Sequence, residues 1–470
     1  MSVEKLCEFG VFELAQLYRR GELSPVEVVN AHLQRCARLN PVLNAYLLIM
    51  HDSAMQAARA AECLFQAEID LGLLQGIPIS VKDLIRVRGT RTTAGSRVLL
   101  QEPPDPEDAA VVQRLRAAGA VIIGKTNLHE FASGDPDPDG PFGLVQNPRA
   151  IGYHSGMSSS GAAAAVAAGL GVIGLGTDTG GSIRIPAYLC GVAGLKPTNG
   201  RIPLDGIIPL SWTLDTVGPL ARRVRDVAAA FVGLESTERL QRETDFLNQL
   251  NESVRGWRIG IPVGDYFSRL QPVVTSAFKR TLKILEDFGC QLIEFTLPGI
   301  EEMAELSLII IRGEASVYHE KYRDREHLYG LGFLKERIIP GRELRASTYL
   351  AACQQKIEFQ KKWLEATRQI DVLIMPSGPA LAPRHGVSKI EIEEESFPFR
   401  PVLSRFARPF NLVGWPALSV PNGVSVEGLP TGVQIICVPN GEFRLLILGH
   451  QVEQALGLTA KLDIEPKYPN

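Results

Sequence analysis

The chain has 470 residues, a formal net charge of −3 and 45% hydrophobic residues. This length can form about two or three average domains, or one large α/β domain with a sizeable core. A charge so close to neutral argues against a nucleic-acid surface, which needs a basic patch. We therefore expect a globular protein that binds no nucleic acid.

The seven cysteines are scattered, with no CxxC pair, and no signal peptide opens the chain. The longest run free of charged or clearly polar residues, 161–176, is too short to span a membrane. These features predict reduced thiols, no membrane contact and a cytoplasmic protein.

Helical patterns dominate the N-terminal part, residues 1–70. Ser24 is a good N-cap, Pro25 suits the first helical position, and Glu27 can complete a capping box. The spacing predicts a helix from this start to about Arg38. We expect the N-terminal helices to pack against the part of the chain that follows.

The stretch 76–83 reads GIPISVKD, in which small and apolar residues run into a single lysine. Burial at the end of a strand disfavours the charged form of Lys82 and so favours the neutral amine, which is a base. The alternative is a structural lysine paired with Asp83 or with another carboxylate. The residues by themselves leave both readings open.

Two motifs resemble ligand sites but lack the context that those sites need. Residues 119–126 match the Walker A pattern, but a helix predicted over 108–118 precedes them and 120–123 is itself strand-like. Residues 135–140 resemble the start of an EF-hand loop, but its twelfth position is Gln146 instead of glutamate. The eight histidines are dispersed. We therefore expect no nucleotide, no metal and no other cofactor.

The stretch 156–203 contains the densest grouping of small residues. A cluster of serines, Ser158 to Ser160, opens an alanine-rich run, and Thr-Asp-Thr-Gly-Gly-Ser follows at 177–182. Adjacent backbone amides beside Gly-Gly can point at one anion, which makes Ser182 a candidate nucleophile. The alternative is ordinary, because serine caps many helices and Gly-Gly-Ser occurs in many turns.

Together these segments make the chain resemble the amidase signature family of serine hydrolases. The resemblance covers most of the chain and is weakest from about 223 to 400. The matching segments are GIPISVKDL at 76–84, GAVIIGKTNLHEFA at 119–132, the stretch 156–203, PLSWTLDTVGPLAR at 209–222, FNLVGWPALSVPNG at 410–423 and GLPTGVQII at 428–436.

The resemblance implies a Ser–Ser–Lys triad. Ser182 is then the nucleophile that carries the acyl group, Ser158 is the bridging serine that relays protons, and Lys82 is the base. The resemblance also implies a cis peptide bond before Ser158. It implies an oxyanion hole made by the backbone amides of Thr179, Gly180, Gly181 and Ser182.

Three positions depart from the family pattern, in which the bridging-serine loop reads GGSSGGS. Met157 stands where glycine is usual, while Ser160 and Ala162 replace a glycine and a serine. We expect the departures to change the local shape of the pocket, and they weaken the case for Ser159 as a structural helper. All three triad residues are present, so we still expect activity.

The resemblance implies one α/β domain over 1–470, with a large mixed sheet, mostly parallel inside, and helices on both faces. Within it, 1–70 supplies N-terminal helices and 70–222 the signature core. The variable region 223–400 is expected to build the substrate pocket, and 401–470 returns to the core.

Helices are predicted in the variable region around Val273 to Phe288 and around Ser347 to Thr367. A further helix is expected to carry Glu314 and Tyr318. This helix either faces the substrate pocket or presents a solvated surface, and the sequence favours neither.

Three functions stay open. The first is a stand-alone amidase that hydrolyses a small, non-peptide carboxamide to an acid and ammonia or an amine. Its partners would be that small molecule and, in a homodimer, a second copy.

The alternative is the glutaminase component of a glutamyl-tRNA amidotransferase, which needs partner subunits. The segment IIPLSW at 207–212 favours the first, because a Tyr-Gly step usual in such glutaminases is missing. The third, a catalytically dead scaffold, is disfavoured by the intact Lys82, Ser158 and Ser182.

Overall fold

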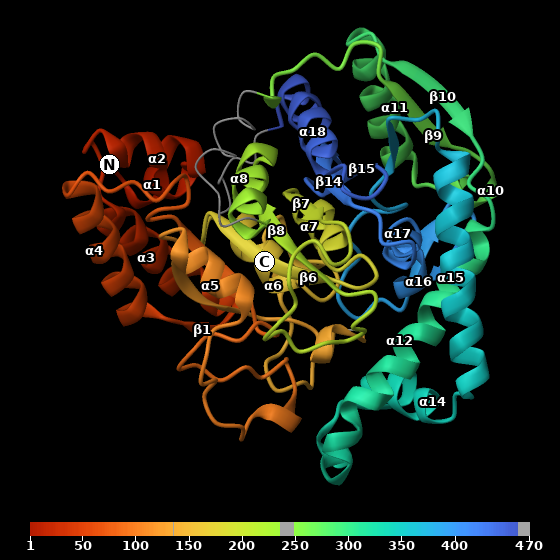
Figure 1. Ribbon diagram of the computed structural model, residues 1–470, viewed down its shortest axis with the longest axis horizontal. Helices are drawn as coiled ribbons and strands as arrows, with labels where there is room; N and C mark the ends of the chain where they lie inside the picture. The colour runs from red at the N-terminus through yellow and green to blue at the C-terminus, as the bar shows by residue number, and fades with distance from the viewer. Residues whose placement is uncertain (135, 236–248, 459–470) are drawn as a thin grey trace.

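The computed structural model describes residues 1–134, 136–235 and 249–458. Helices near the N-terminus form one end of the molecule (Figure 1), namely α1 Val3–Glu8, α2 Val11–Arg19, α3 Pro25–Leu43 and α4 His51–Gln66. The capping box predicted for α3 is present, with the Glu27 carboxylate accepting from the Ser24 amide at 3.0 Å. The helix continues beyond its predicted end at Arg38.

An eleven-stranded sheet crosses the molecule in the order β1-β3-β2-β6-β8-β7-β14-β15-β11-β9-β10. Parallel pairing occurs in two blocks, β3–β2–β6 and β11–β9–β10, and the six other pairs are antiparallel. The predicted α/β domain with a mixed sheet is confirmed, although its parallel share is smaller than expected. The strands are β1 Tyr46–Ile49, β2 Pro78–Lys82, β3 Val121–Thr126, β6 Ile173–Asp178, β7 Ala193–Lys196, β8 Thr216–Ala221, β9 Arg258–Pro262, β10 Gln291–Phe295, β11 Val372–Pro376, β14 Ala417–Val424 and β15 Pro430–Ile436.

Among the described residues, two short hairpins lie outside this sheet. They pair β4 Gln146–Asn147 with β5 Ala150–His154, and β12 Lys389–Ile392 with β13 Glu395–Pro398. The remaining α-helices are α5 Ala110–Ala117, α6 Ser160–Ala167, α7 Arg184–Cys190, α8 Val224–Glu235, α10 Asp265–Ser268, α11 Pro272–Asp287, α12 Met303–His319, α13 Leu331–Phe333, α14 Ile339–Arg342, α15 Ala346–Ala366, α16 Phe399–Ser404, α17 Arg408–Leu412 and α18 Glu442–Leu456.

The central strand β6 shows how helices cover both faces of the sheet. Side chains alternate between the two faces of a strand. Ile173 and Leu175 join the apolar cluster that also contains α8 and α18, whereas the glycines between and after them face α6. A Cβ atom on Gly174 would lie 3.0 Å from the Ala162 carbonyl oxygen, so only glycine lets α6 approach this closely.

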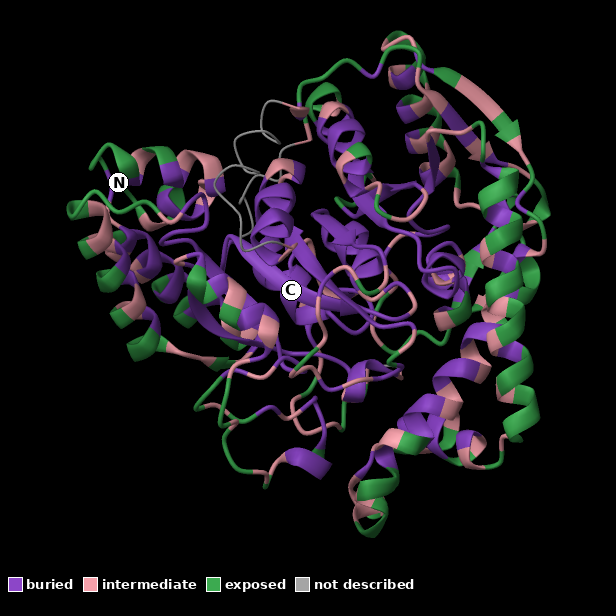
Figure 2. Cartoon of the chain, viewed as in Figure 1, coloured by how far each residue is buried: buried purple, intermediate pink, exposed green. Residues whose placement is uncertain are grey.

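The predicted helices of the variable region are confirmed as α11 and α15. Helix α15 and its neighbour α12 form the opposite edge of the molecule from the N-terminal helices, and α15 is exposed along much of its length (Figures 1 and 2). Its inner face carries the buried Phe359 and Trp363, which pack beneath it.

The Walker A match is a coincidence of sequence. Lys125 lies within the buried strand β3 and forms a 2.6 Å ion pair with Asp83. The EF-hand-like stretch begins at Asp135, which lies outside the described residues.

Within the described ranges, none of the helices has the length and apolar character needed to span a membrane. All seven cysteines are free thiols, and Cys63 is the exposed one.

Replacing Gly161 with alanine tests the close packing of α6. Alanine is the better helix former by about 1 kcal/mol, but its methyl group would meet the backbone at Asn127 and the Ala45 carbonyl oxygen at 2.5 Å. We expect Gly161→Ala to lower the free energy of unfolding by about 1–3 kcal/mol. Gly332→Ala is the matched control, since nothing lies within 4 Å of its Cβ position. Urea denaturation of the two variants measures the difference, and equal stabilities would contradict the packing argument.

Candidate active site

The last residue of β2, Lys82, directs its amine into a group of hydroxyls. Its Nζ atom lies 2.7 Å from Ser158 Oγ, 3.0 Å from Ser159 Oγ and 2.9 Å from Thr177 Oγ1. The side chain is fully buried. Burial lowers the pKa of Lys82 to about 7, while the charges of Asp178 and Asp215 act in the opposite direction. A large fraction of the amine is therefore neutral near pH 7.

Other buried lysines show what distinguishes this one. Lys125 is paired with Asp83, so the structural alternative considered for Lys82 applies to a different lysine. Lys196 contacts the Pro197 carbonyl oxygen at 2.7 Å and an asparagine side chain. Lys82 instead contacts hydroxyl groups, which can exchange protons with it.

The serines beside Lys82 differ in what their protons do. The Ser159 hydroxyl donates to the Thr177 carbonyl oxygen at 3.0 Å, so its proton is already committed. Ser158 has no such acceptor in the described part of the chain and is free to exchange its proton with Lys82. Ser160 begins α6, and its buried hydroxyl has no partner there either.

The expected cis peptide bond before Ser158 is wrong for this structure. All peptide bonds of the described residues are trans. The Ser159 amide donates to the Met157 carbonyl oxygen at 3.0 Å, and this tight turn brings Ser158 to Lys82 without the cis bond. Met157 itself packs into an apolar cluster with Ile185 and Tyr188.

Ser182 follows a turn that only glycine can form. Gly181 has a φ of 114°, and a Cβ atom there would lie 2.6 Å from Ile185 Cδ1. Ser182 is half-buried, and no hydrogen bond joins it to Ser158 among the described residues. The Gly181 amide donates to Asp178 Oδ1 at 2.7 Å. Within the described chain, the amides of Thr179, Gly180 and Ser182 have no such acceptor.

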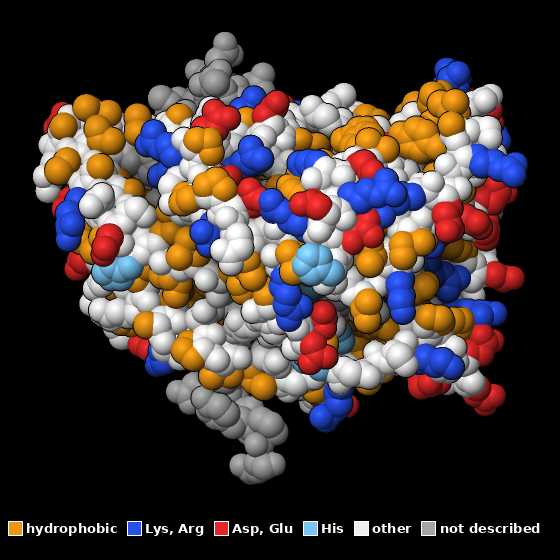
Figure 3. Space-filling view, turned by 90° about the horizontal axis from the view of Figure 1, so that it is seen from below, with side chains coloured by type: hydrophobic (Ala, Val, Ile, Leu, Met, Phe, Trp, Pro, Cys, Tyr) orange, Lys and Arg blue, Asp and Glu red, His pale blue; other side chains and the backbone are white. Residues whose placement is uncertain are grey.

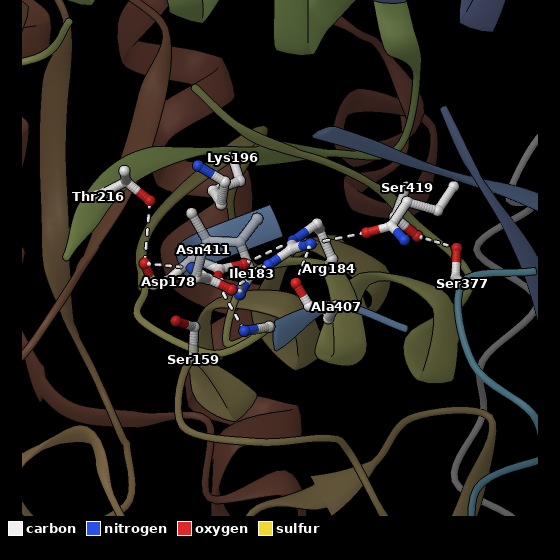
Figure 4. A network of polar contacts seen from close by, with 12 residues as sticks. Ser159, Asp178, Ile183, Arg184, Lys196, Thr216, Ser377, Ala407, Asn411 and Ser419 are labelled. Carbon is white, nitrogen blue, oxygen red and sulfur yellow. Dashed lines mark hydrogen bonds and ion pairs between the residues drawn. The ribbon is translucent and has the colours of Figure 1, made fainter. Parts of the chain in front are cut away.

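A buried ion pair holds this turn in place (Figure 4). Arg184 donates to Asp178 through Nε and Nη2, each at 3.0 Å. The same guanidinium donates to the Asn411 side chain, to Gln434 Oε1 and to the Ala407 carbonyl oxygen. Segments more than 220 residues apart in sequence therefore meet at one planar group.

The Asp178 carboxylate fixes both ends of the Gly-Gly-Ser turn at 180–182. Besides Gly181, it accepts from the Ile183 amide at 3.1 Å and from Asn411 Nδ2 at 2.8 Å. Burial acts to raise the pKa of Asp178, but Arg184 outweighs it and holds that pKa well below its usual range. A charged residue on each side of Gly-Gly-Ser is the sequence signal that could have revealed this pair.

A second buried carboxylate, Asp215, was missed because nothing in its local sequence marks it. It accepts from the Thr179 hydroxyl at 2.5 Å and from two backbone amides. Glu314 lies behind it, buried, and accepts from Ser211 Oγ and Thr213 Oγ1 at 2.7 Å. Glu314 therefore anchors the 211–213 segment and lies on no solvated face.

A cavity of about 470 Å³ lies next to the loop that carries Ser158. Ser155, Gly156 and Ser160 form part of its wall, but none of Lys82, Ser158 and Ser182 does. Its other walls include Phe142, Tyr329, Phe333 and Glu336, and the three histidines His129, His154 and His385. No group of three or more His, Cys, Asp or Glu side chains in the described ranges has the arrangement of a metal site.

Removal of one partner of the Asp178–Arg184 pair should strongly destabilise the protein. Removing one partner of a buried pair leaves an unpaired buried charge, so we expect Arg184→Met to lower the unfolding free energy by about 3–5 kcal/mol. The control is Lys283→Met, which breaks an exposed pair with Asp287 and should leave the unfolding curve unchanged. Chemical denaturation checks both, and a fully stable Arg184→Met protein would contradict the assignment.

Comparison with known proteins places this geometry in a family. The family model described as Amidase matches residues 27–446. Among curated relatives, the A-type subunit of glutamyl-tRNA(Gln) amidotransferase from Heliobacterium modesticaldum is 34% identical over 97% of this chain and 99% of that protein. The protein of the same name from Chloroflexus aurantiacus is 36% identical over 91% and 93%.

Solved structures agree with this placement. A structure described as an amidase has a TM-score of 0.86 and 34% identity, covering 96% of this chain and 100% of the other. A chain from a vestigial complex, reported to reveal the origins of an s-triazine catabolic enzyme, has a TM-score of 0.89 and 31% identity over 96% and 99%. The peptide amidase of Stenotrophomonas maltophilia has a TM-score of 0.81 and 28% identity over 97% and 99%.

The relatives correct three expectations. The expected closer resemblance to stand-alone amidases is wrong, because curated relatives that match almost end to end are named as subunits of the amidotransferase. The same finding overturns the reading as a stand-alone hydrolase of small carboxamides. It also overturns the expectation of a small-molecule partner without nucleic acid, since those relatives are named for an enzyme of glutamyl-tRNA. The segment 207–212 is a local difference, and it does not outweigh identity along the whole chain.

Three observations lead to one conclusion. Lys82 lies among hydroxyl groups, a Gly-Gly-Ser turn follows β6, and the family model matches most of the sequence. The chain belongs to the Amidase family and is an amidohydrolase.

Proposed function

We propose that this chain is the glutaminase subunit of a tRNA-dependent amidotransferase. The observation that carries the proposal is its near end-to-end similarity to the A-type subunits of glutamyl-tRNA(Gln) amidotransferases. In this role the chain releases ammonia from glutamine, and partner subunits use that ammonia on the tRNA-bound substrate. This work takes place in the cytoplasm, where aminoacyl-tRNA is made and used.

The proposed chemistry assigns one role to each triad residue. Neutral Lys82 accepts a proton from Ser158, and Ser158 accepts one from Ser182, whose oxygen then attacks the amide carbonyl carbon. The 2.7 Å contact between Lys82 and Ser158 and the low pKa of the amine support the first transfer. The second transfer requires the Ser182 side chain to turn toward Ser158 when substrate binds.

The oxyanion of the tetrahedral intermediate is proposed to rest on the amides of Thr179, Gly180 and Ser182. The Gly181 amide already donates to Asp178, so its part is to shape the turn. Such donors typically contribute roughly 10²–10³ in rate each. The proton then returns through Ser158 to the leaving nitrogen, ammonia departs, and water hydrolyses the acyl-enzyme on Ser182.

The charge distribution supports a division of labour between the proposed partners. On the face shown in Figure 3, Lys and Arg side chains are interspersed with Asp and Glu, without a continuous basic field. The whole chain carries a net charge of −3. Phosphate-backbone binding needs clustered cations, so we assign the principal tRNA contacts to the partner subunits.

Lys82 should act as a base that must be neutral. We expect the glutaminase rate to rise with pH through about 7 and to level off above it, because burial lowers the pKa of Lys82 to that value. Lys82→Arg keeps the charge but cannot give up its proton, so it should be as inactive as Lys82→Ala at every pH. Ammonia release measured against pH checks this. Substantial turnover by Lys82→Arg would make the lysine an electrostatic support and not a base.

Ser158 and Ser159 form a matched pair for testing the relay. Ser158→Ala should reduce turnover by orders of magnitude and leave the fold intact, because it removes the only hydroxyl proposed to link Lys82 with Ser182. Ser159→Ala should keep much more of the activity, since its proton is committed to the Thr177 carbonyl oxygen. A fluorophosphonate probe followed by peptide mapping should label Ser182 in the wild type. Equal losses in the two variants, or a label on Ser158, would contradict these roles.

Assembly with partners tests the proposed role in an amidotransferase. The chain is purified alone and together with the other amidotransferase subunits of its own organism, and both samples are assayed with glutamine and glutamyl-tRNA(Gln). We expect the assembly to convert the tRNA-bound glutamate to glutamine, and Ser182→Ala to abolish this with glutamine but not with added ammonia. Failure of the chain to co-purify with those partners, or of the assembly to use glutamine, would overturn the proposal.

A further inference from the structure

Two buried carboxylates lie at or just beyond the end of the β6–β8 ladder, whose Thr177 contacts the Lys82 amine. They differ in how their charge is balanced. Asp178 is paired with Arg184 through two contacts of 3.0 Å. Asp215 accepts from neutral donors: the Thr179 hydroxyl at 2.5 Å and the amides of Leu210 and Ser211 at 2.9 and 3.0 Å. In the described ranges of the chain, Asp215 forms no ion pair with any cation.

The sheet places Asp215 beside the segment 179–182, which is called the nucleophile turn because it ends at the proposed nucleophile Ser182. Asp178, the last residue of β6, pairs with Thr216, the first of β8, so Thr179 and Asp215 are adjacent just beyond the end of the ladder. The hydrogen bond from the Thr179 hydroxyl to the Asp215 carboxylate links the two chain segments just beyond that end of the ladder. Thr179 also supplies the first amide of the nucleophile turn, and so the Asp215 carboxylate is joined directly to it.

We infer that Asp215 is a positioning residue for the reaction: its unbalanced charge is the counter-ion for Lys82 when the amine takes a proton, and its bond to Thr179 holds the nucleophile turn. This inference rests on the proposed function, in which Lys82 is the base. When a proton passes from Ser158 to Lys82, a positive charge forms in a buried place. A nearby carboxylate whose charge is not already neutralised stabilises that ammonium.

The protonation states suit this role. Burial raises the pKa of Asp215 to about 6, and its three hydrogen bonds oppose that rise, so the carboxylate is mostly ionised at pH 7. Glu314, from α12, faces Asp215 and also raises its pKa. The Lys82 charge also acts on the imidazole of His129, whose pKa burial lowers to about 3, so that this ring stays neutral.

Three variants separate the charge from the hydrogen bond, and a fourth, Asp215→Glu, tests whether a carboxylate at this position restores the wild-type behaviour. Asp215→Asn removes the charge and keeps an oxygen that can accept from Thr179. Thr179→Val removes the hydroxyl and keeps the carboxylate. Thr216→Val is the control, because this buried neighbour donates to the Asp178 carbonyl oxygen and not to Asp215. For each, the rate of fluorophosphonate labelling of Ser182 is measured from pH 5.5 to 9; this readout needs neither substrate nor partner subunits.

The expected results differ for each variant. Without the Asp215 charge the ammonium is less stable, so Asp215→Asn should move the midpoint of the pH curve down by roughly one unit and lower the plateau. Thr179→Val should lower the plateau and leave the midpoint in place. Thr216→Val should change neither midpoint nor plateau, and Asp215→Glu should restore the wild-type midpoint. An unshifted midpoint in Asp215→Asn, or an equal shift in Thr216→Val, would overturn the inference.

Two further measurements keep the result decisive. If Asp215→Asn does not fold, the wild type labelled with ¹³C at the lysine ε carbons tests the same coupling. The Lys82 signal should then show a second inflection near pH 6 from Asp215, and a single inflection would overturn the inference. Failure of the proposed function has a different signature. If Lys82 is not the base, the probe would label Ser182 of the Lys82→Ala variant with the wild-type pH profile, whatever residue stands at position 215.

Discussion

The site depends on one buried amine that has no anionic contact. Water solvates an ammonium strongly, and hydroxyl oxygens replace that solvation only in part, so burial of Lys82 favours the uncharged form. The surrounding strands and side chains keep this amine away from water and from direct contact with an anion. The strands on each side exclude water, Asp83 is already paired with Lys125, and Asp178 is already paired with Arg184. An unpaired carboxylate in direct contact with Lys82 would favour its charged form and leave no neutral amine at the site.

Glycine makes the required packing possible. Gly174 and Gly176 let α6 lie directly against β6, and a Cβ atom on Gly176 would be 2.8 Å from Ser159 Oγ. This close approach is what brings the serines of the α6 N-terminus to the end of β2. Gly181 then allows the sharp turn before Ser182. The buried Asp178–Arg184 pair adds little net stability by itself, but it fixes this turn in a single arrangement.

Much of the fold and part of the site could be predicted from the sequence. The capped helix α3, the variable-region helices and the α/β class follow from local signals and from the family motifs, and the structure confirms them. The contact of Lys82 with Ser158 also agrees with the motif pattern. The cis peptide bond that the family resemblance implied before Ser158 is absent from the described residues. The preference for a stand-alone enzyme failed because it weighed one short segment, 207–212, against similarity along the whole chain.

By itself, the sequence pointed to Lys82, Ser158 and Ser182 as candidates for the chemistry, because short motifs encode strand ends, turns and caps through local backbone preferences. Only the tertiary structure decided which charges are free to act. Lys82 meets Thr177 across 95 positions of sequence, and Arg184 meets Asn411 across 227. Whether an aspartate is paired, as Asp178 is, or unbalanced, as Asp215 is, depends on which side chains the sheet brings beside it. The spacing of Asp178 and Arg184 indicates their pairing, but whether a cation lies beside Asp215 is set by long-range packing, which leaves no mark in the local sequence.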